Sequence, residues 1–158
     1  MTQPRPRLVG DEFANEIAAI QSHCFPNAWN ADSVRRILEM SGAQAMIMPA
    51  PKGAGAGTAV GFALIGMAAD EAEILSIGVL PGWRRQGIAS QLITGAIELA
   101  DGLGATVMFL EVAASNSGAK ELYRRHGFLV SGERSGYYTL PSGEREDAVC
   151  MRLNLAGA

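Results

Sequence analysis

Residues 71–92 read EAEILSIGVLPGWRRQGIASQL, and their hydrophobic period changes at Pro81-Gly82. The part before this break is predicted to be a strand whose side chains alternate between two faces, with Ile74, Ser76 and Gly78 opposite Leu75, Ile77 and Val79. After the break, apolar residues recur at helical spacing, at Ile88, Leu92, Ala96, Leu99 and Leu103. A strand that leads through a short loop into a long helix predicts an α/β domain.

The loop RRQGIA, residues 84–89, opens the predicted helix. The first amides of a helix lack partners and carry about half a positive charge, so an anion such as a pyrophosphate is favoured there. Gly87 has no Cβ to obstruct a phosphate, and Arg84 and Arg85 add charge beside it. The motifs GxxxxGKS/T and GxGxxG are absent, so a nucleoside triphosphatase or dinucleotide fold is not indicated. Taken alone, the loop also fits an ordinary junction with two solvated arginines.

The rest of the chain predicts elements on both sides of this junction. Upstream are a strand over residues 7–10, a helix from an Asp11 cap to about Cys24, a helix capped by Asn30 or Asp32, and strands over 44–48 and 58–67. Downstream are a strand over 106–112, a helix over 118–126 that is capped by Asn116 or Ser117 and ended by a left-handed Gly127, and strands over 129–140 and 147–155. We expect one domain over residues 1–158, with a mixed, largely antiparallel sheet.

Composition narrows the function classes. The chain has 158 residues, with 48% hydrophobic and 18% charged residues, which is typical of a globular domain. The net charge of −3 argues against a general nucleic-acid binder. No apolar run is long enough to span a membrane, so we expect a cytoplasmic protein without a membrane partner. Neither the two cysteines nor the two histidines have the spacing of metal ligands, and we expect no metal.

Three motifs in register carry a resemblance to a known family. Arg84-x-x-Gly87-x-Ala89 is similar to the Q/R-x-x-G-x-G/A signature of the GNAT N-acetyltransferase superfamily. Residues 110–116, LEVAASN, and 122–128, LYRRHGF, resemble two further motifs of that superfamily. The resemblance implies the GNAT fold, with six to seven strands, about four helices and a splay between the fourth and fifth strands. It also implies acetyl-CoA as the acyl donor.

The resemblance assigns a role to each part of the donor site. It implies that the coenzyme A pyrophosphate binds the backbone amides of the loop, which consists of Arg84, Arg85, Gln86, Gly87, Ile88 and Ala89. It implies that the pantetheine arm pairs with the strand over Ile77, Gly78 and Val79, and that an amide of about Ile77 or Val79 polarises the thioester carbonyl. Asn116 is expected to bond the pantetheine arm, or to be a plain helix cap.

The same resemblance assigns the catalytic groups. Glu111 lies at the end of a strand, in the position of the base of the LEVxxSN motif. Glu73 is the rival, because it matches the glutamate that serves as base in the histone-acetylating branch; either residue could act through a water. Tyr123 is expected to be the acid that protonates the leaving thiolate and to contact the coenzyme, since a phenol stays protonated at neutral pH.

The C-terminal part resembles the bacterial ribosomal-protein-alanine N-acetyltransferases (RimI-like), which end in YY…EDA. Residues predicted to line the acceptor groove are Tyr137, Tyr138, Glu146 and Asp147. The expected acceptor is a protein or peptide N-terminus, of which a ribosomal protein is one case, and the expected state is a monomer or weak dimer. Two departures concern the acceptor side: residues 27–28 separate Pro26 from Trp29 in the FPW segment, and the loop over 52–57 is expanded. There are two alternatives to this function: the acceptor is a small-molecule amine, or the chain is a coenzyme A-binding domain without turnover.

Overall fold

Seven strands form one sheet in a computed structural model, which describes residues 5–51 and 58–155. The strand order is β1-β2-β3-β4-β5-β7-β6. The bounds are β1 Arg7–Val9, β2 Gln44–Pro49, β3 Ala59–Ala68, β4 Glu71–Val79, β5 Val107–Ala113, β6 Leu129–Thr139 and β7 Arg145–Asn154. All neighbours are antiparallel except β4 and β5, which are parallel. The predicted order of elements and the mixed sheet are confirmed, whereas the expanded loop over 52–57 lies outside the described residues.

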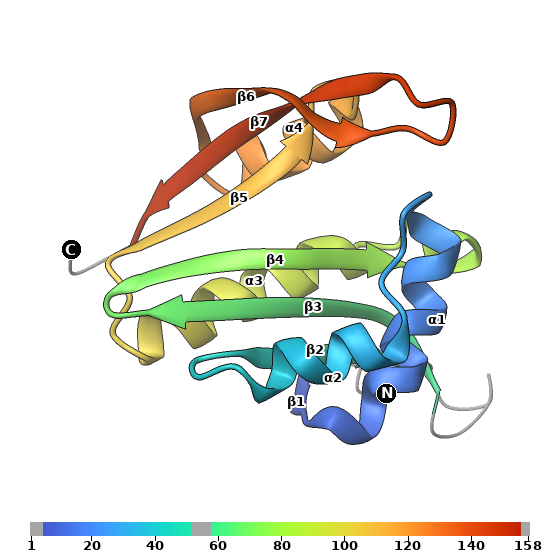
Figure 1. Cartoon of the computed structure of the whole chain (residues 1–158). Coiled ribbons are helices and arrows are strands. Elements are labelled where there is room, and N and C mark those ends of the chain that lie inside the picture. The colour runs from blue at the N-terminus through green and yellow to red at the C-terminus, as the bar shows by residue number, and fades with distance from the viewer. Residues whose placement is uncertain (1–4, 52–57, 156–158) are drawn as a thin grey trace.

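The parallel pair β4–β5 is joined over only part of its length. Glu71–Ile74 pairs with Val107–Leu110, and among the residues that the structure describes the β4–β5 ladder ends there. β5 nevertheless stays paired with β7 as far as Ala113. The second half of β4 therefore diverges from β5, and Figure 1 shows the sheet opening between them toward the right. This is the splay that the family resemblance implies.

Helices cover the sheet on both faces. The bounds are α1 Ala14–Cys24, α2 Ala31–Glu39, α3 Ile88–Gly102 and α4 Ser117–Arg125, with short 3-10 turns over Asp11–Phe13 and Pro81–Trp83. In Figure 1, α1 and α2 lie in front of the sheet and α3 lies behind it. One apolar core fills the α3 side and includes Leu92, Met108 and Phe128. A smaller core on the other side includes Ile17 and Phe62.

Two local predictions are wrong. Asp11 does not cap the first helix: it lies within a 3-10 turn, and α1 begins at Ala14. The Gly10 amide, just before this turn, donates a hydrogen bond to the Glu12 carboxylate. Strict alternation along β4 also fails. The register against β3 shifts at Leu64/Ile65, so that Ile74, Ile77 and Val79 all face the α3 core. A bulge adds one residue to one strand, which reverses the side-chain alternation beyond it. By contrast, Asn30 caps α2 as expected.

Candidate active site

The loop between β4 and α3 has an unusual backbone. Arg85 has φ +62°, and Gly87 has φ +78°. A non-glycine residue in this left-handed region is held there at a cost and tends to occur at functional sites. The first helical bond of α3 runs from the Gln91 amide to the Gly87 carbonyl, so the amides of residues 88–90 precede the hydrogen-bonded ladder. The loop thus presents the free amides and positive helix end that favour an anion.

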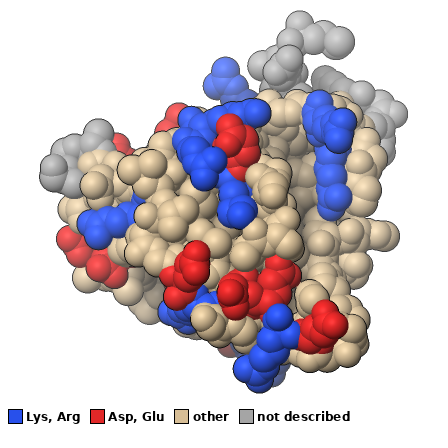
Figure 2. Space-filling view, turned by 90° about the horizontal axis from the view of Figure 1, so that it is seen from above, with Lys and Arg blue, Asp and Glu red and all other residues tan. Residues whose placement is uncertain are grey.

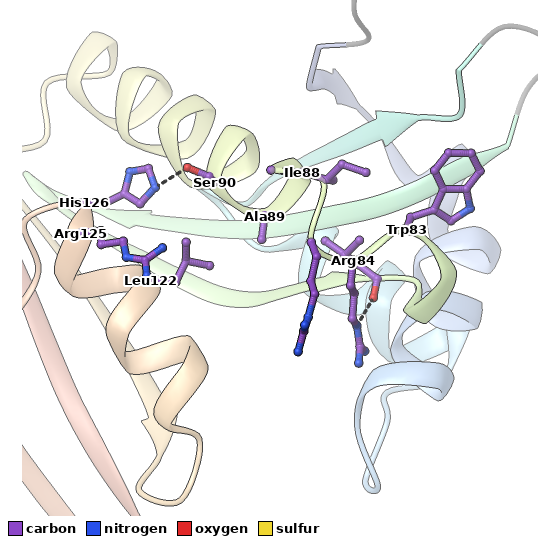
Figure 3. A pocket seen from close by; sticks show the side chains of 11 residues that line it. Trp83, Arg84, Ile88, Ala89, Ser90, Leu122, Arg125 and His126 are labelled. Carbon is purple, nitrogen blue, oxygen red and sulfur yellow. Dashed lines mark hydrogen bonds between the residues drawn. The ribbon is translucent and has the colours of Figure 1, made fainter.

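A cavity of about 410 Å³ lies beside this loop. Its walls come from three places: the end of β4, the loop with the first turn of α3, and the last turn of α4. Figure 3 shows Leu122, Arg125 and His126 on the α4 side facing the loop and Ala89 across the opening. The cavity therefore lies on the α3 side of the sheet, between the end of β4 and the end of α4.

Arg84 is turned toward the end of β4. Its Nε donates a hydrogen bond of 3.0 Å to the Val79 carbonyl, and its Nη2 lies 3.5 Å from the Cys24 sulfur. The Cys24 thiol donates to the same carbonyl at 3.4 Å. Arg84 thus braces the loop against β4 as well as lining the cavity. The Val79 carbonyl thus accepts two hydrogen bonds, which occupy both of its lone pairs.

Ser90 and His126 form a contact that the sequence patterns do not reveal. Ser90 Oγ and His126 Nε2 lie 2.8 Å apart, at hydrogen-bond distance, and both line the cavity. Burial lowers the pKa of His126, so the imidazole is neutral at pH 7. The contact joins the first turn of α3 to the end of α4 across the splay. The one available signal was a histidine directly before the left-handed Gly127.

Glu111 lies on the opposite face of the sheet from this cavity. Met108 and Leu110 of β5 point into the α3 core, so Glu111, which alternates with them, faces the other side. Its side chain is 18% exposed, and its Oε1 forms an ion pair with Arg134 Nε at 3.0 Å. Glu73 of β4 is close by: partial burial of its carboxylate, with the negative charge of Glu111, raises the pKa of Glu73. The two candidate bases are therefore close enough for the charge of one to affect the pKa of the other.

Tyr123 of α4 lies on the α3 side of the sheet. It is 8% exposed within the main core, and its ring meets Phe128 edge-on at 6.0 Å. Burial raises the pKa of Tyr123 to about 12, and the neighbouring Tyr138 adds to this shift. Burial and the charge of Glu111 likewise raise the pKa of Tyr138 to about 12. Tyr138 thus interacts electrostatically with both Tyr123 and Glu111.

The four predicted acceptor residues divide into two pairs. The rings of Tyr137 and Tyr138 are 5.0 Å apart, and the charge of Glu111 raises the pKa of Tyr137. Glu146 instead accepts a bond of 2.8 Å from the Ser115 amide, and hydrogen bonds from the side chain and the amide of Ser115 lower the pKa of Glu146. Asp147 accepts one of 2.8 Å from the Gly136 amide. The structure brings the tyrosines to Glu111, whereas these two carboxylates hold the backbone of neighbouring turns.

Asn116 and the surface charges complete the site. The Asn116 side chain accepts a bond of 3.1 Å from the Ala119 amide, so its oxygen caps α4. Figure 2 shows basic and acidic side chains interspersed on the face seen from above, and α4 pairs Arg124 and Arg125 with Glu121. Among residues 5–51 and 58–155, no helix could cross a membrane. Within the same ranges, no group of three or more His, Cys, Asp or Glu side chains could hold a metal ion.

Comparisons with known proteins all find similarity to acetyltransferases. The model of the acetyltransferase (GNAT) family matches residues 14–128. A ribosomal protein bS18-alanine N-acetyltransferase of Haemophilus ducreyi is 38% identical over 96 residues, which are 61% of this chain and 66% of that protein. The Escherichia coli enzyme of the same name is 36% identical over 100 residues, 63% of this chain and 67% of that one. The crystal structure of the ribosomal-protein-S18-alanine N-acetyltransferase from Escherichia coli matches with a TM-score of 0.88 and 25% identity, over 99% of this chain and 96% of that one.

Proposed function

Since this chain belongs to the GNAT acetyltransferase family, we propose that it transfers the acetyl group of acetyl-CoA to the N-terminal α-amine of a protein. The family establishes the reaction class, an N-acetyl transfer with acetyl-CoA as the donor. The acceptor is suggested by relatives named as bS18-alanine N-acetyltransferases, whose matches span about two thirds of their own length. An alanine-type N-terminus, such as that of a ribosomal protein, is accordingly the acceptor we favour.

The observation that carries this proposal is the position of Glu111 and Tyr123. They lie on opposite faces of the sheet, and both interact electrostatically with Tyr138. The phosphate loop and its cavity are on the Tyr123 side, and the acceptor tyrosines are on the Glu111 side. A donor thioester that entered along β4 would then have a base on its acceptor side and an acid on its donor side.

The chemistry matches an α-amine better than a lysine. An α-amino group has a reference pKa near 8, so deprotonation at pH 7 costs about 1.4 kcal/mol, whereas a lysine costs nearly 5 kcal/mol, at ~1.36 kcal/mol per unit. A carboxylate such as Glu111 is a modest base that suits the smaller cost. The fourth strand of the sheet supplies the backbone amides near the splay, of which that of Ile77 or Val79 would polarise the carbonyl.

In the proposed reaction, Glu111 accepts a proton from the acceptor ammonium, directly or through one water. The free amine attacks the thioester carbonyl carbon, and the carbon–sulfur bond breaks. Tyr123 donates its phenolic proton to the departing thiolate, which leaves as coenzyme A. The acetylated nitrogen loses its second proton, through water, to the Tyr123 phenolate, and Glu111 releases the proton it accepted to solvent. Glu73 remains the rival base because it lies close to Glu111, whose negative charge adds to the effect of burial in raising the pKa of Glu73.

Two experiments test the proposal. Mass spectrometry of protein N-termini, from cells with and without this chain, should reveal one or a few termini whose acetylation depends on it. In vitro, the chain is offered acetyl-CoA with alanine- and serine-starting peptides and with free amines. Turnover of a free amine with none on any peptide would refute the proposed acceptor. Acetyl-CoA binding without turnover of any amine would point to a binding domain.

Glu111→Gln tests the assignment of the base. We expect kcat to fall about 10²- to 10⁴-fold, the usual contribution of a general base. Glu133→Gln is the matched control, because Glu133 is an exposed glutamate in β6, next to Arg134 in the chain. Glu73→Gln should have a much smaller effect. If Glu73→Gln has the large effect and Glu111→Gln has none, the two roles are reversed.

A further inference from the structure

Arg134 places a positive charge on the proposed base. Its Nε lies 3.0 Å from Glu111 Oε1, and its guanidinium carbon lies 5.1 Å from the centre of the Tyr137 ring. The Arg134 side chain is 58% exposed, whereas that of Glu111 is 18% exposed. The carboxylate is thus the more buried partner, and the arginine covers it from the solvent side.

The backbone of β6 is shaped to hold this arrangement. The register against β7 shifts between Arg134 and Tyr138, so that the intervening residues bulge out of the ladder. Gly136 at the centre of the bulge has φ +58°, and its amide donates to the Asp147 carboxylate. Arg145 donates from the other side to the Gly136 carbonyl at 3.4 Å. The bulge brings Arg134 and Tyr137 together over Glu111, and it explains why Asp147 is bound to backbone.

The acceptor of the proposed reaction arrives as a cation. An α-ammonium group must approach Glu111 to lose its proton, and this position is held by the Arg134 guanidinium in the free protein. Removing the cation from a largely buried carboxylate without a replacement is costly. Replacing the guanidinium by another cation avoids this cost, because the Glu111 carboxylate stays paired throughout.

We propose that acceptor binding exchanges cations at Glu111: the α-ammonium replaces the guanidinium of Arg134, which swings toward solvent while its stem stays on Tyr137. This inference rests on the proposed function, because it takes Glu111 as the base and an ammonium group as the acceptor. Arg134 is then a specificity-determining residue. It keeps the base covered until a cationic amine arrives, and it disfavours neutral nucleophiles, which cannot replace it.

Exchange and simple binding differ in their salt dependence. When one cation replaces another, the number of exposed charges changes little, so the peptide KM should vary little with ionic strength. When a cation binds an uncovered carboxylate, salt screens the attraction and the KM rises. A merely structural role of Arg134 would not alter this dependence.

The test compares the full chain with Arg134→Met, which keeps an apolar stem but removes the charge. At low salt we expect the peptide KM to fall about two- to fivefold, the range for releasing one partly exposed ion pair. The KM should then rise more steeply with salt than in the unaltered chain, and the KM for acetyl-CoA should not change. Arg134→Lys, which keeps a cation, should behave like the unaltered chain.

Arg152→Met is the matched control. Arg152 is exposed in β7 and lies over the Phe109 ring at 5.5 Å, so it is also an arginine on an aromatic ring, but its Nε donates to the neutral side chain of Asn154. It should leave the KM values and their salt dependence unchanged. Calorimetric binding of the same peptide to the chain loaded with coenzyme A gives the same comparison without turnover.

Three results would overturn the exchange. One is a higher peptide KM for Arg134→Met, which would mean that the guanidinium binds the acceptor itself. Another is an unchanged salt dependence in this variant. The third is a failure of cationic peptides to bind the loaded chain. If the unaltered chain acetylates only free amines, the proposed acceptor fails, and the exchange is then judged by the same comparison with the amine that is accepted.

Discussion

The side-chain amide of Asn27 donates a hydrogen bond of 2.6 Å to the main-chain carbonyl of Thr139. Asn27 lies between α1 and α2, and Thr139 is the last residue of β6, directly after Tyr138. Figure 1 shows the segment between α1 and α2 rising toward the end of the β6–β7 hairpin, across the splay. The bond therefore joins the two halves of the sheet at the acceptor side. Asn27 belongs to the two residues that separate Pro26 from Trp29, one of the departures from the RimI-like pattern.

Asn27→Ala should weaken the acceptor site alone. Losing one neutral hydrogen bond costs about 0.5–1.5 kcal/mol, so we expect the peptide KM to rise about two- to tenfold. The KM for acetyl-CoA should stay the same, because the donor cavity is on the other face. Thr139→Val is the control, since the bond is to a main-chain carbonyl that valine retains. Equal effects of both variants would show that the hairpin tip, and not this bond, is responsible.

Gly87→Ala tests the phosphate loop against a matched glycine. Gly87 has φ +78° and Gly104 has φ +91°, and a Cβ added to either meets no atom of residues 5–51 and 58–155 within 4 Å. Both substitutions should therefore lower stability by about 1–2 kcal/mol through backbone strain. Gly87 lines the cavity, whereas Gly104 does not. We expect only Gly87→Ala to raise the acetyl-CoA KM, by about tenfold or more if one charged hydrogen bond is lost. Similar KM values for both would argue against the loop as the pyrophosphate site.

Tyr123→Phe tests the acid. We expect kcat to fall about 10²- to 10⁴-fold, with little change in stability, because the ring and its packing on Phe128 remain. The pKa of Tyr123 is raised to about 12, so the phenol keeps its proton as the pH rises to 10. Ionisation of Tyr123 should therefore not limit the rate within this range. Tyr138→Phe is the comparison, because Tyr138 has a similar pKa and lies nearby. A larger loss in that variant would transfer the acid role to Tyr138.

The sequence predicted most of what is encoded locally. The bounds Glu71–Val79 of β4 and the caps at Asn30 and Asn116 agree with the structure, because each depends on residues a few positions away. Gly127 has φ +97° as expected after α4. The strand order follows largely from the same information, since most sequential strands pair with their neighbours.

What the sequence did not reveal depends on partners distant in the chain. The β4 bulge is a property of the pairing with β3 and leaves no mark on the alternation within β4. Glu146 and Asp147 looked like free carboxylates for an acceptor amine, yet they bind the amides of Ser115 and Gly136. A carboxylate near a binding groove is equally suited to both tasks. Only the tertiary structure shows which amides lie within its reach.

The Ser90–His126 contact predicts how stability depends on pH. Burial lowers the pKa of His126 below its usual value of 6.5, so the unfolded chain takes up the proton first as the pH falls. Folding stability from this group is complete above pH 6.5 and is lost as the pH drops through 6.5 toward the lower folded value. The melting temperature should therefore fall between pH 7.5 and 5.5, and His126→Gln should reduce that fall.

His23→Gln is the matched control for this prediction, because His23 is exposed on α1 and has no place in the cavity. This variant should retain the pH dependence of the unaltered chain. Ser90→Ala separates the contact from burial: it removes the hydroxyl but leaves the imidazole covered, so most of the pH dependence should persist while the acetyl-CoA KM rises. A pH dependence that is identical in His126→Gln and the unaltered chain would mean that another group titrates in this window. In that case protonation of His126 would not be the cause of the lower melting temperature.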